Sequence, residues 1–178
     1  MIDVKIYDYM KAVLMQPLLR VRRASSMAMF GFGEWVPSKD YKENDCVVST
    51  FCLHLQCPWR VIDKENSNIF FASYDMYVPN SSLEWTKDFN WDKIGNNLFD
   101  ENRSKWMEEN KNLYVKDVEL YEWGDLRLEL SNGHMIEVFA NTSFKLTTDD
   151  SWGEELWRFF DNIEEKNLVM TGRGSMLS

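Results

Sequence analysis

The stretch Leu126-Arg-Leu-Glu-Leu-Ser-Asn-Gly-His-Met-Ile-Glu-Val138 carries the clearest fold signal of this 178-residue chain. Apolar and polar residues alternate on both sides of its Asn-Gly pair, which is the pattern of two strands with one buried face. Asn-Gly favours a two-residue type I′ turn, because both central residues of that turn need positive φ. The stretch therefore predicts an antiparallel hairpin. Its expected buried face carries Leu126, Leu128, Leu130, Ile136 and Val138.

Similar segments on both sides of this hairpin predict further strands. Val47–Cys57 is the strongest of them, because it is β-branched and aromatic at first and then alternates. Gly31 and Gly33 lie inside another apolar segment, Ser26–Trp35, where glycine indicates a bulge or a close approach of two backbones. The remaining expected strands are Trp59–Ile62, Ile69–Ser73, Leu113–Trp123 and Leu156–Phe160.

The first residues predict a helix. Apolar residues recur at three- and four-residue spacing over Asp3–Gln16, and Asp3 is a suitable N-cap. Pro17 ends the helix, since proline cannot continue the hydrogen-bond ladder of the backbone.

The middle of the chain, residues 80–112, differs in composition and resembles an insertion on a β scaffold. It is rich in Asn, Asp, Glu, Lys and Trp, and predicts a loop up to Asn97 followed by a short helix over Asp100–Asn110 with Asp100 as its cap. The whole chain is therefore expected to be α+β and mainly β. It would be an antiparallel meander of roughly six to eight strands with one N-terminal helix and a short helix in the middle insertion. Residues 1–170 are expected to form a single domain, and residues 171–178 a loose tail.

Charge is distributed unevenly. The chain carries 20 Lys and Arg against 29 Asp and Glu, a formal net charge of −9. Residues 1–40 hold six basic and four acidic side chains, so nearly all of the acidity lies after Asp40. A chain of this sign repels phosphate, which argues against a nucleic-acid partner held by a basic patch. The aromatic content of 15 % excludes intrinsic disorder.

Cysteine usage and the N-terminus indicate the cytoplasm. Cys46, Cys52 and Cys57 are odd in number, which favours a reducing compartment over a disulfide scaffold. Their spacing does not match the Cys pairs of a structural zinc site, and the chain has only two His, so we expect no metal and no cofactor. Met1-Ile2-Asp3 lacks the basic start of a secretory signal, and no apolar run approaches the roughly 20 residues of a membrane span. We therefore expect no membrane partner.

Four segments stand out together. They are Arg23-Ala-Ser-Ser-Met-Ala-Met-Phe-Gly-Phe-Gly33, Leu53-His-Leu-Gln-Cys-Pro-Trp-Arg60, the hairpin end Ile136-Glu-Val-Phe139, and Glu155-Leu-Trp-Arg-Phe-Phe160. They resemble a family of small, stand-alone bacterial proteins, and the His-x-Gln-Cys-Pro-Trp-Arg motif is the most specific of them. The chain departs from that family at Ala140-Asn141, where such proteins often carry Pro-Asp. The resemblance implies a fold and a bacterial origin, and no established activity.

The motif contains the first candidate site. Its members are Cys52, His54, Gln56, Cys57 and Arg60. Cys52 and His54 lie two residues apart on one face of a strand, where a thiol and an imidazole can meet and activate a nucleophile. No neighbour in the sequence supplies the third group that would orient the imidazole. The alternative, which we favour, is that the cysteines pack as small apolar groups and the polar residues hydrogen-bond one another across the sheet. We assign no catalytic residue.

The second candidate site is an acidic surface that carries tryptophan. Its members are Asp88, Trp91, Asp92, Trp106, Glu108 and Glu109. Tryptophan supplies much of the binding energy of protein interfaces, and carboxylates would steer a basic partner toward it. The alternative is that these tryptophans fill the core of a small β domain.

These two sites lead to two hypotheses. The first is a non-enzymatic cytoplasmic interaction protein, for example one of the immunity type that covers the basic active site of a toxin acting on nucleic acid. The second is a small-molecule-binding or enzymatic β domain built around Cys52, His54, Gln56 and Arg60. A homodimer whose acidic residues only keep it in solution is a third possibility.

Overall fold

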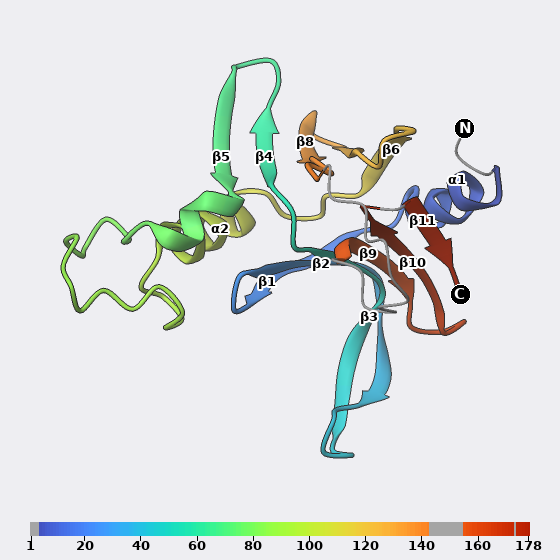
Figure 1. Cartoon of the computed structure of the whole chain (residues 1–178), viewed down its shortest axis with the longest axis horizontal. Helices are drawn as coiled ribbons and strands as arrows, with labels where there is room; N and C mark the ends of the chain where they lie inside the picture. Colours follow the sequence, from blue (N-terminus) through green and yellow to red (C-terminus); the bar gives the residue numbers. More distant parts are fainter. Residues whose placement is uncertain (1–3, 143–154, 173) are drawn as a thin grey trace.

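Two antiparallel sheets form the body of the molecule in the computed structural model, which describes residues 4–142, 155–172 and 174–178 (Figure 1). The six-stranded sheet contains, in spatial order, β1 (Leu18–Ala24), β2 (Met27–Lys39), β3 (Asp45–Leu55), β9 (Glu155–Asp161), β10 (Lys166–Thr171) and β11 (Gly174–Leu177). The five-stranded sheet contains β5 (Asn68–Ala72), β4 (Trp59–Asp63), β8 (His134–Val138), β7 (Leu126–Leu130) and β6 (Val115–Leu120). The helices are α1 (Val4–Met10), η1 (Lys11–Val13), η2 (Ser73–Tyr77) and α2 (Leu98–Glu109).

The predicted fold class, α+β and mainly β with an N-terminal helix and a short middle helix, is confirmed. The described residues contain eleven strands, more than the six to eight expected, because Leu18–Ala24, Lys166–Thr171 and Gly174–Leu177 also pair. The chain passes from one sheet to the other at residues 56–58, between β3 and β4. Phe30 of β2 and Trp59 of β4 meet edge to face with ring centroids 5.5 Å apart, so the core lies between the sheets.

The hairpin of β7 and β8 forms as expected, but its turn is of another kind. Leu128 pairs with Ile136, and the predicted inner face is buried. Gly133 has a φ of 85°, whereas Asn132 does not have positive φ, and the N–H of Gly133 donates to the carbonyl oxygen of Leu130 at 2.9 Å. This is a three-residue loop that ends in a left-handed glycine, and it corrects the predicted type I′ turn.

The bulge predicted for the glycines of β2 is confirmed at Gly33. At Gly31 the close neighbour is a side chain and not a second backbone, because a Cβ there would lie 2.6 Å from the hydroxyl oxygen of Ser49. Gly33 has a φ of 94° and lies where the register between β2 and β3 shifts. Beyond this bulge, β2 and β3 continue as a two-stranded arm that extends away from the sheets (Figure 1).

Both ends of the chain differ from the expectation. The first helix ends early: α1 stops at Met10 and η1 at Val13, after which Met15 takes a φ of 62° and the chain becomes extended. The proposed cap Asp3 lies outside the described residues. The expected loose tail is wrong over Gly174–Leu177, which forms β11 against β10. No helix among the described residues is long and apolar enough to cross a membrane.

The middle region contains η2, a loop and α2, and its loop extends from one side of the molecule (Figure 1). The N-cap of α2 is Asn97, whose side-chain oxygen accepts a hydrogen bond from the N–H of Asp100 at 2.9 Å. This corrects the prediction that Asp100 is the cap. The carboxylate of Asp100 instead binds Arg23 of β1.

Candidate functional site

His54 lies in a cross-strand row on the outer face of the six-stranded sheet. In that row Arg22 of β1 is opposite Met29 of β2, Met29 is opposite His54 of β3, and His54 is opposite Arg158 of β9. The next row places Arg20, Gly31, Cys52 and Phe160 side by side. Residues of one row share a face of the sheet, so these strands bring arginines from distant segments toward His54.

The surroundings of His54 keep its imidazole neutral. Burial first, and then the positive charges of Arg158, Arg22 and Arg20, together lower its pKa to about 4. Its ring packs edge to face on Phe160, with centroids 4.8 Å apart. An imidazole that stays neutral down to this pH cannot form the imidazolium that stabilises a thiolate.

Cys52 is equally unsuited to act as a nucleophile. It is 4 % exposed, and burial raises the pKa of its thiol to about 11 in spite of the nearby Arg20 and Arg22. Cys57 is buried as well, and its thiol pKa is raised to about 12 by the same cause. Both cysteines pack as small apolar groups, as the alternative interpretation of the motif expected.

The other motif residues are not gathered around His54. Gln56 is exposed in the passage between the sheets. Arg60 belongs to the five-stranded sheet, where its Nη2 lies 2.6 Å from Oε2 of Glu137 on β8. The structure therefore divides the predicted cluster between the two sheets.

A charged row that the sequence analysis missed crosses the outer face of the five-stranded sheet. Glu119, Arg127, Glu137 and Arg60 are successive cross-strand neighbours on β6, β7, β8 and β4. Nε of Arg127 lies 3.2 Å from Oε1 of Glu137, so this buried carboxylate lies between two guanidinium groups. The opposite charges of Arg127 and Glu137, on the two strands of the predicted hairpin, were the available signal for this row.

A small pocket lies beside that row, with a volume of about 130 Å³. Its lining includes Tyr121 and Trp123, whose rings stack at 5.5 Å, together with Asp125, Arg127 and Glu137. Trp123 is 68 % exposed. A second, more open pocket of about 410 Å³ lies between α2 and β5.

The prediction that Trp106 belongs to the acidic surface is wrong. Trp106 is 1 % exposed and packs in the core against Phe71, while its indole N–H donates to Nδ1 of His134 at 3.2 Å. Its burial follows from its spacing: Phe99 and Trp106 are seven residues apart and lie on one face of α2, and both are buried.

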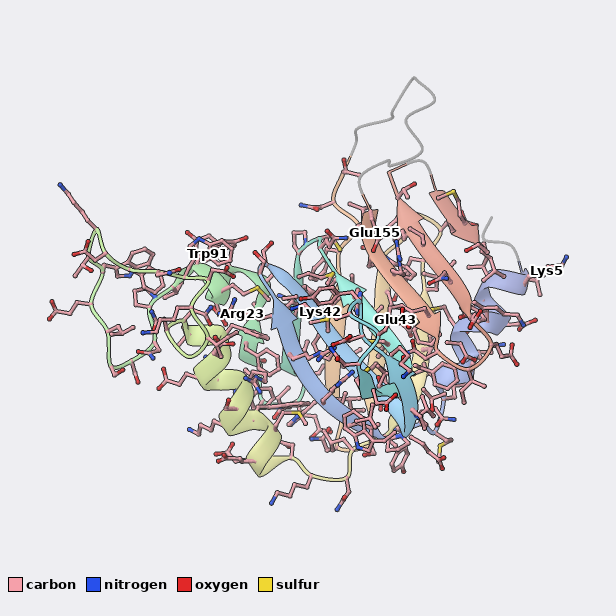
Figure 2. The ribbon with its side chains drawn as sticks, turned by 90° about the horizontal axis from the view of Figure 1, so that it is seen from below. Lys5, Arg23, Lys42, Glu43, Trp91 and Glu155 are labelled. Carbon is pink, nitrogen blue, oxygen red and sulfur yellow. The ribbon has the colours of Figure 1, made fainter. Side chains whose placement is uncertain are left out.

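The remaining members of that surface are at least partly accessible. Asp88, Glu108 and Glu109 are exposed. Trp91 is half-buried with its ring 5.1 Å from that of Tyr77, and the carboxylate of Asp92 lies 3.3 Å from Nη1 of Arg23. Figure 2 shows Arg23 beside the loop that carries Trp91.

Segment 73–97 exposes more apolar surface than the sequence analysis recognised. Its exposed large side chains are Tyr74, Tyr77, Leu83, Trp85 and Ile94. Trp85 is 69 % exposed, and its ring lies edge to face on Phe89. We refer to residues 73–97 as the 73–97 surface.

Among the described residues no group of three or more His, Cys, Asp or Glu side chains could hold a metal ion. The roles given to the residues above rest on their contacts in this structure. Comparison of the chain with protein-family models, with curated proteins and with solved structures found no match.

Proposed function

We propose that this protein binds a basic protein partner through the 73–97 surface and has no catalytic activity of its own. The observation that carries the proposal is the exposure of Trp85, Tyr74 and their apolar neighbours on one segment. Several large apolar side chains exposed on one segment mark an interaction site. Monomeric proteins rarely expose such a group, because it is more stable when a partner removes it from water. Trp and Tyr are also the residues that most often dominate binding energy.

The charge of the surface supports a basic partner. Residues 73–97 carry four carboxylates and two lysines, and the exposed Glu108 and Glu109 follow on α2. The whole chain has a net charge of −9. Complementary charge accelerates the encounter of two proteins and selects against acidic competitors.

The 73–97 surface is held in place before any partner arrives. Nη2 of Arg23 donates to the carbonyl oxygens of Trp91 and Asp92 at 3.3 Å and 3.2 Å. The side-chain amide of Asn97 also donates to the carbonyl oxygen of Trp91, at 2.8 Å. A binding loop that is already ordered loses less conformational entropy on association.

The partner we infer is a protein whose own activity needs a positively charged surface, such as a toxin that acts on nucleic acid. An acidic, aromatic surface placed over that region would exclude the substrate, as an immunity protein does. The compartment we propose is the bacterial cytoplasm. The free thiols of Cys46, Cys52 and Cys57 are compatible with its reducing conditions.

The test uses two tryptophans of matched exposure. The full chain is immobilised as wild type, as Trp85→Ala, as Asp88→Lys and as the control Trp123→Ala, and is exposed to lysate of the native host at low and high salt. We expect a basic protein to be captured by wild type and Trp123→Ala, and lost with Trp85→Ala, with Asp88→Lys and at high salt. Equal capture by Trp85→Ala and Trp123→Ala, or capture of acidic proteins alone, would contradict the proposal. Reversing the charges of Glu108 and Glu109 then shows whether α2 extends the surface.

A further inference from the structure

The outer face of the six-stranded sheet concentrates positive charge in an otherwise acidic chain. Arg20 and Arg22 come from β1 and Arg158 from β9, on either side of His54. Glu155 pairs with Arg158, and the thiol of Cys52 in the adjacent row is neutral. Three guanidinium groups and one carboxylate leave a local charge of about +2 around a neutral imidazole.

Two of these arginines have unused hydrogen-bond donors. Nε of Arg20 and Nε of Arg158 are inaccessible to solvent and have no hydrogen-bond partner within the part of the chain that the structure describes. A buried N–H that bonds neither to protein nor to water costs free energy, and it is rare in folded proteins. A bound acceptor with several oxygen atoms would satisfy such donors once the two guanidinium groups turn toward it.

Arg20 is also held in position by its neighbours. The guanidinium of Arg20 lies over the ring of Trp35, 4.9 Å from its centroid. Gly31, between Arg20 and Cys52 in its row, has no side chain, and a Cβ there would lie 3.1 Å from Cγ of Arg20. The arginine stem can therefore lie flat across the sheet toward β3, instead of extending into solvent.

We propose that this face, around Arg20, Arg22, His54 and Arg158, binds the phosphate group of a small molecule. The charge of about −2 on a phosphate monoester matches the local excess, and its oxygens accept hydrogen bonds from several guanidinium groups at once. Neutral His54 adds one further N–H donor. A long nucleic acid is the less suitable ligand, because the phosphates beyond the site would face a chain of net charge −9. The proposed phosphate site contains no residue of the 73–97 surface, so a negative test of one proposal does not bear on the other.

The chain contains two histidines, which makes the experiment specific. His54 reports on the site, and His134, on β8 of the other sheet, is an internal reference. The imidazole resonances of the full-length protein are followed by NMR at about pH 7.5, where inorganic phosphate is mostly the dianion, while phosphate replaces chloride at constant ionic strength. His54→Gln and His134→Gln assign the two sets of signals.

We expect saturable shifts of the His54 resonances, with those of His134 unchanged, and a higher His54 pKa in phosphate than in chloride. Arg22→Gln and Arg158→Gln should each weaken phosphate binding by about tenfold, since each removes one charge-assisted contact. Lys64→Gln, a basic residue in the exposed β4–β5 turn, should leave it unchanged.

Three results would overturn the proposal. The first is a shift of equal size at both histidines, which would indicate a general salt effect. The second is an equal response to acetate, which would show that a single negative charge suffices and that phosphate is not the ligand class. The third is tighter binding of a single-stranded oligonucleotide than of phosphate, which would identify a different class of ligand. A variant that fails to fold is recognised by its amide spectrum, and the other arginine variant then decides.

Discussion

Arg23 of β1 and Asp100 of α2 form a buried ion pair that joins the middle region to the six-stranded sheet. Nη2 of Arg23 lies 2.9 Å from Oδ2 of Asp100, and their side chains are 1 % and 4 % exposed. Nε of Arg23 also donates to Oδ1 of Asp100 at 3.1 Å, and the N–H of Gly95 donates to Oδ2 at 2.8 Å. One arginine thus holds both the start of α2 and the loop before it.

Removing one partner of this pair should be costly. Arg23→Met leaves the carboxylate of Asp100 buried without its cation, and we expect a loss of about 3–5 kcal/mol in the free energy of unfolding, measured with urea. The double variant Arg23→Met/Asp100→Leu should recover part of that loss. Hydrogen exchange at the Gly95 amide should accelerate more than exchange in β7. Lys39→Met, which breaks the exposed pair with Asp45, is the control and should cost less than about 1 kcal/mol. A loss as small for Arg23→Met would show that the pair does not hold the region.

Tryptophan substitutions should separate core from surface. Trp106→Ala removes a ring that is 1 % exposed, so we expect a loss of about 3–5 kcal/mol in the free energy of unfolding. Trp85→Ala removes a ring that is 69 % exposed and should change stability by less than about 0.5 kcal/mol. Thermal and urea unfolding of the two variants measure the difference. Similar losses for both would mean that the 73–97 surface is packed against the body of the protein and not free for a partner.

The strands were predictable because their signal is local. The alternation around Asn-Gly predicts the paired strands β7 and β8, and the apolar runs Trp59–Ile62 and Ile69–Ser73 predict two strands that the structure contains as β4 and β5. The type of turn is harder to predict, because it depends on which residues of the loop take the left-handed conformation. The left-handed conformation of Gly133 alone closes the loop, and the residue types did not distinguish this from two left-handed residues.

The sites were less predictable because they depend on contacts between distant segments. Strand alternation places Arg23 on the face opposite Arg20 and Arg22, but nothing local indicates that its partner lies 77 residues away. The motif around His54 suggested one cluster, yet the passage between the sheets follows directly after it and sends Arg60 to Glu137. Proximity in sequence and proximity in space differ most where a chain changes sheets.

Gly31 should tolerate no side chain unless Ser49 is altered. Because an added Cβ would lie 2.6 Å from the hydroxyl oxygen of Ser49, we expect Gly31→Ala to destabilise the protein by about 1–3 kcal/mol. That hydroxyl is buried and has no hydrogen-bond partner in the described residues, so Ser49→Ala alone should be close to neutral. The double variant should be more stable than Gly31→Ala, as shown by the urea midpoint. Additive losses in the double variant would contradict a direct clash between these two positions.

His54 should make stability depend on pH between about 7 and 5. Its pKa is near 6.5 in the unfolded chain and about 4 in the folded protein, mainly because of burial. Between these values the unfolded state binds more protons, so the stabilisation is complete above the unfolded pKa and is lost as the pH falls toward the folded one. We expect wild type to lose about 1–2 kcal/mol between pH 7 and pH 5 through this group, after allowance for its partial exposure. His54→Gln cannot take up this proton, so it should lose less stability over the same pH range, when urea unfolding is measured in chloride without phosphate.

His134→Gln is the matched control and should follow wild type more closely, because the ring of His134 is less deeply buried and the nearby Asp63 partly offsets the lowering of its pKa. Parallel pH profiles for wild type and His54→Gln would show that the folded protein does not hold His54 neutral.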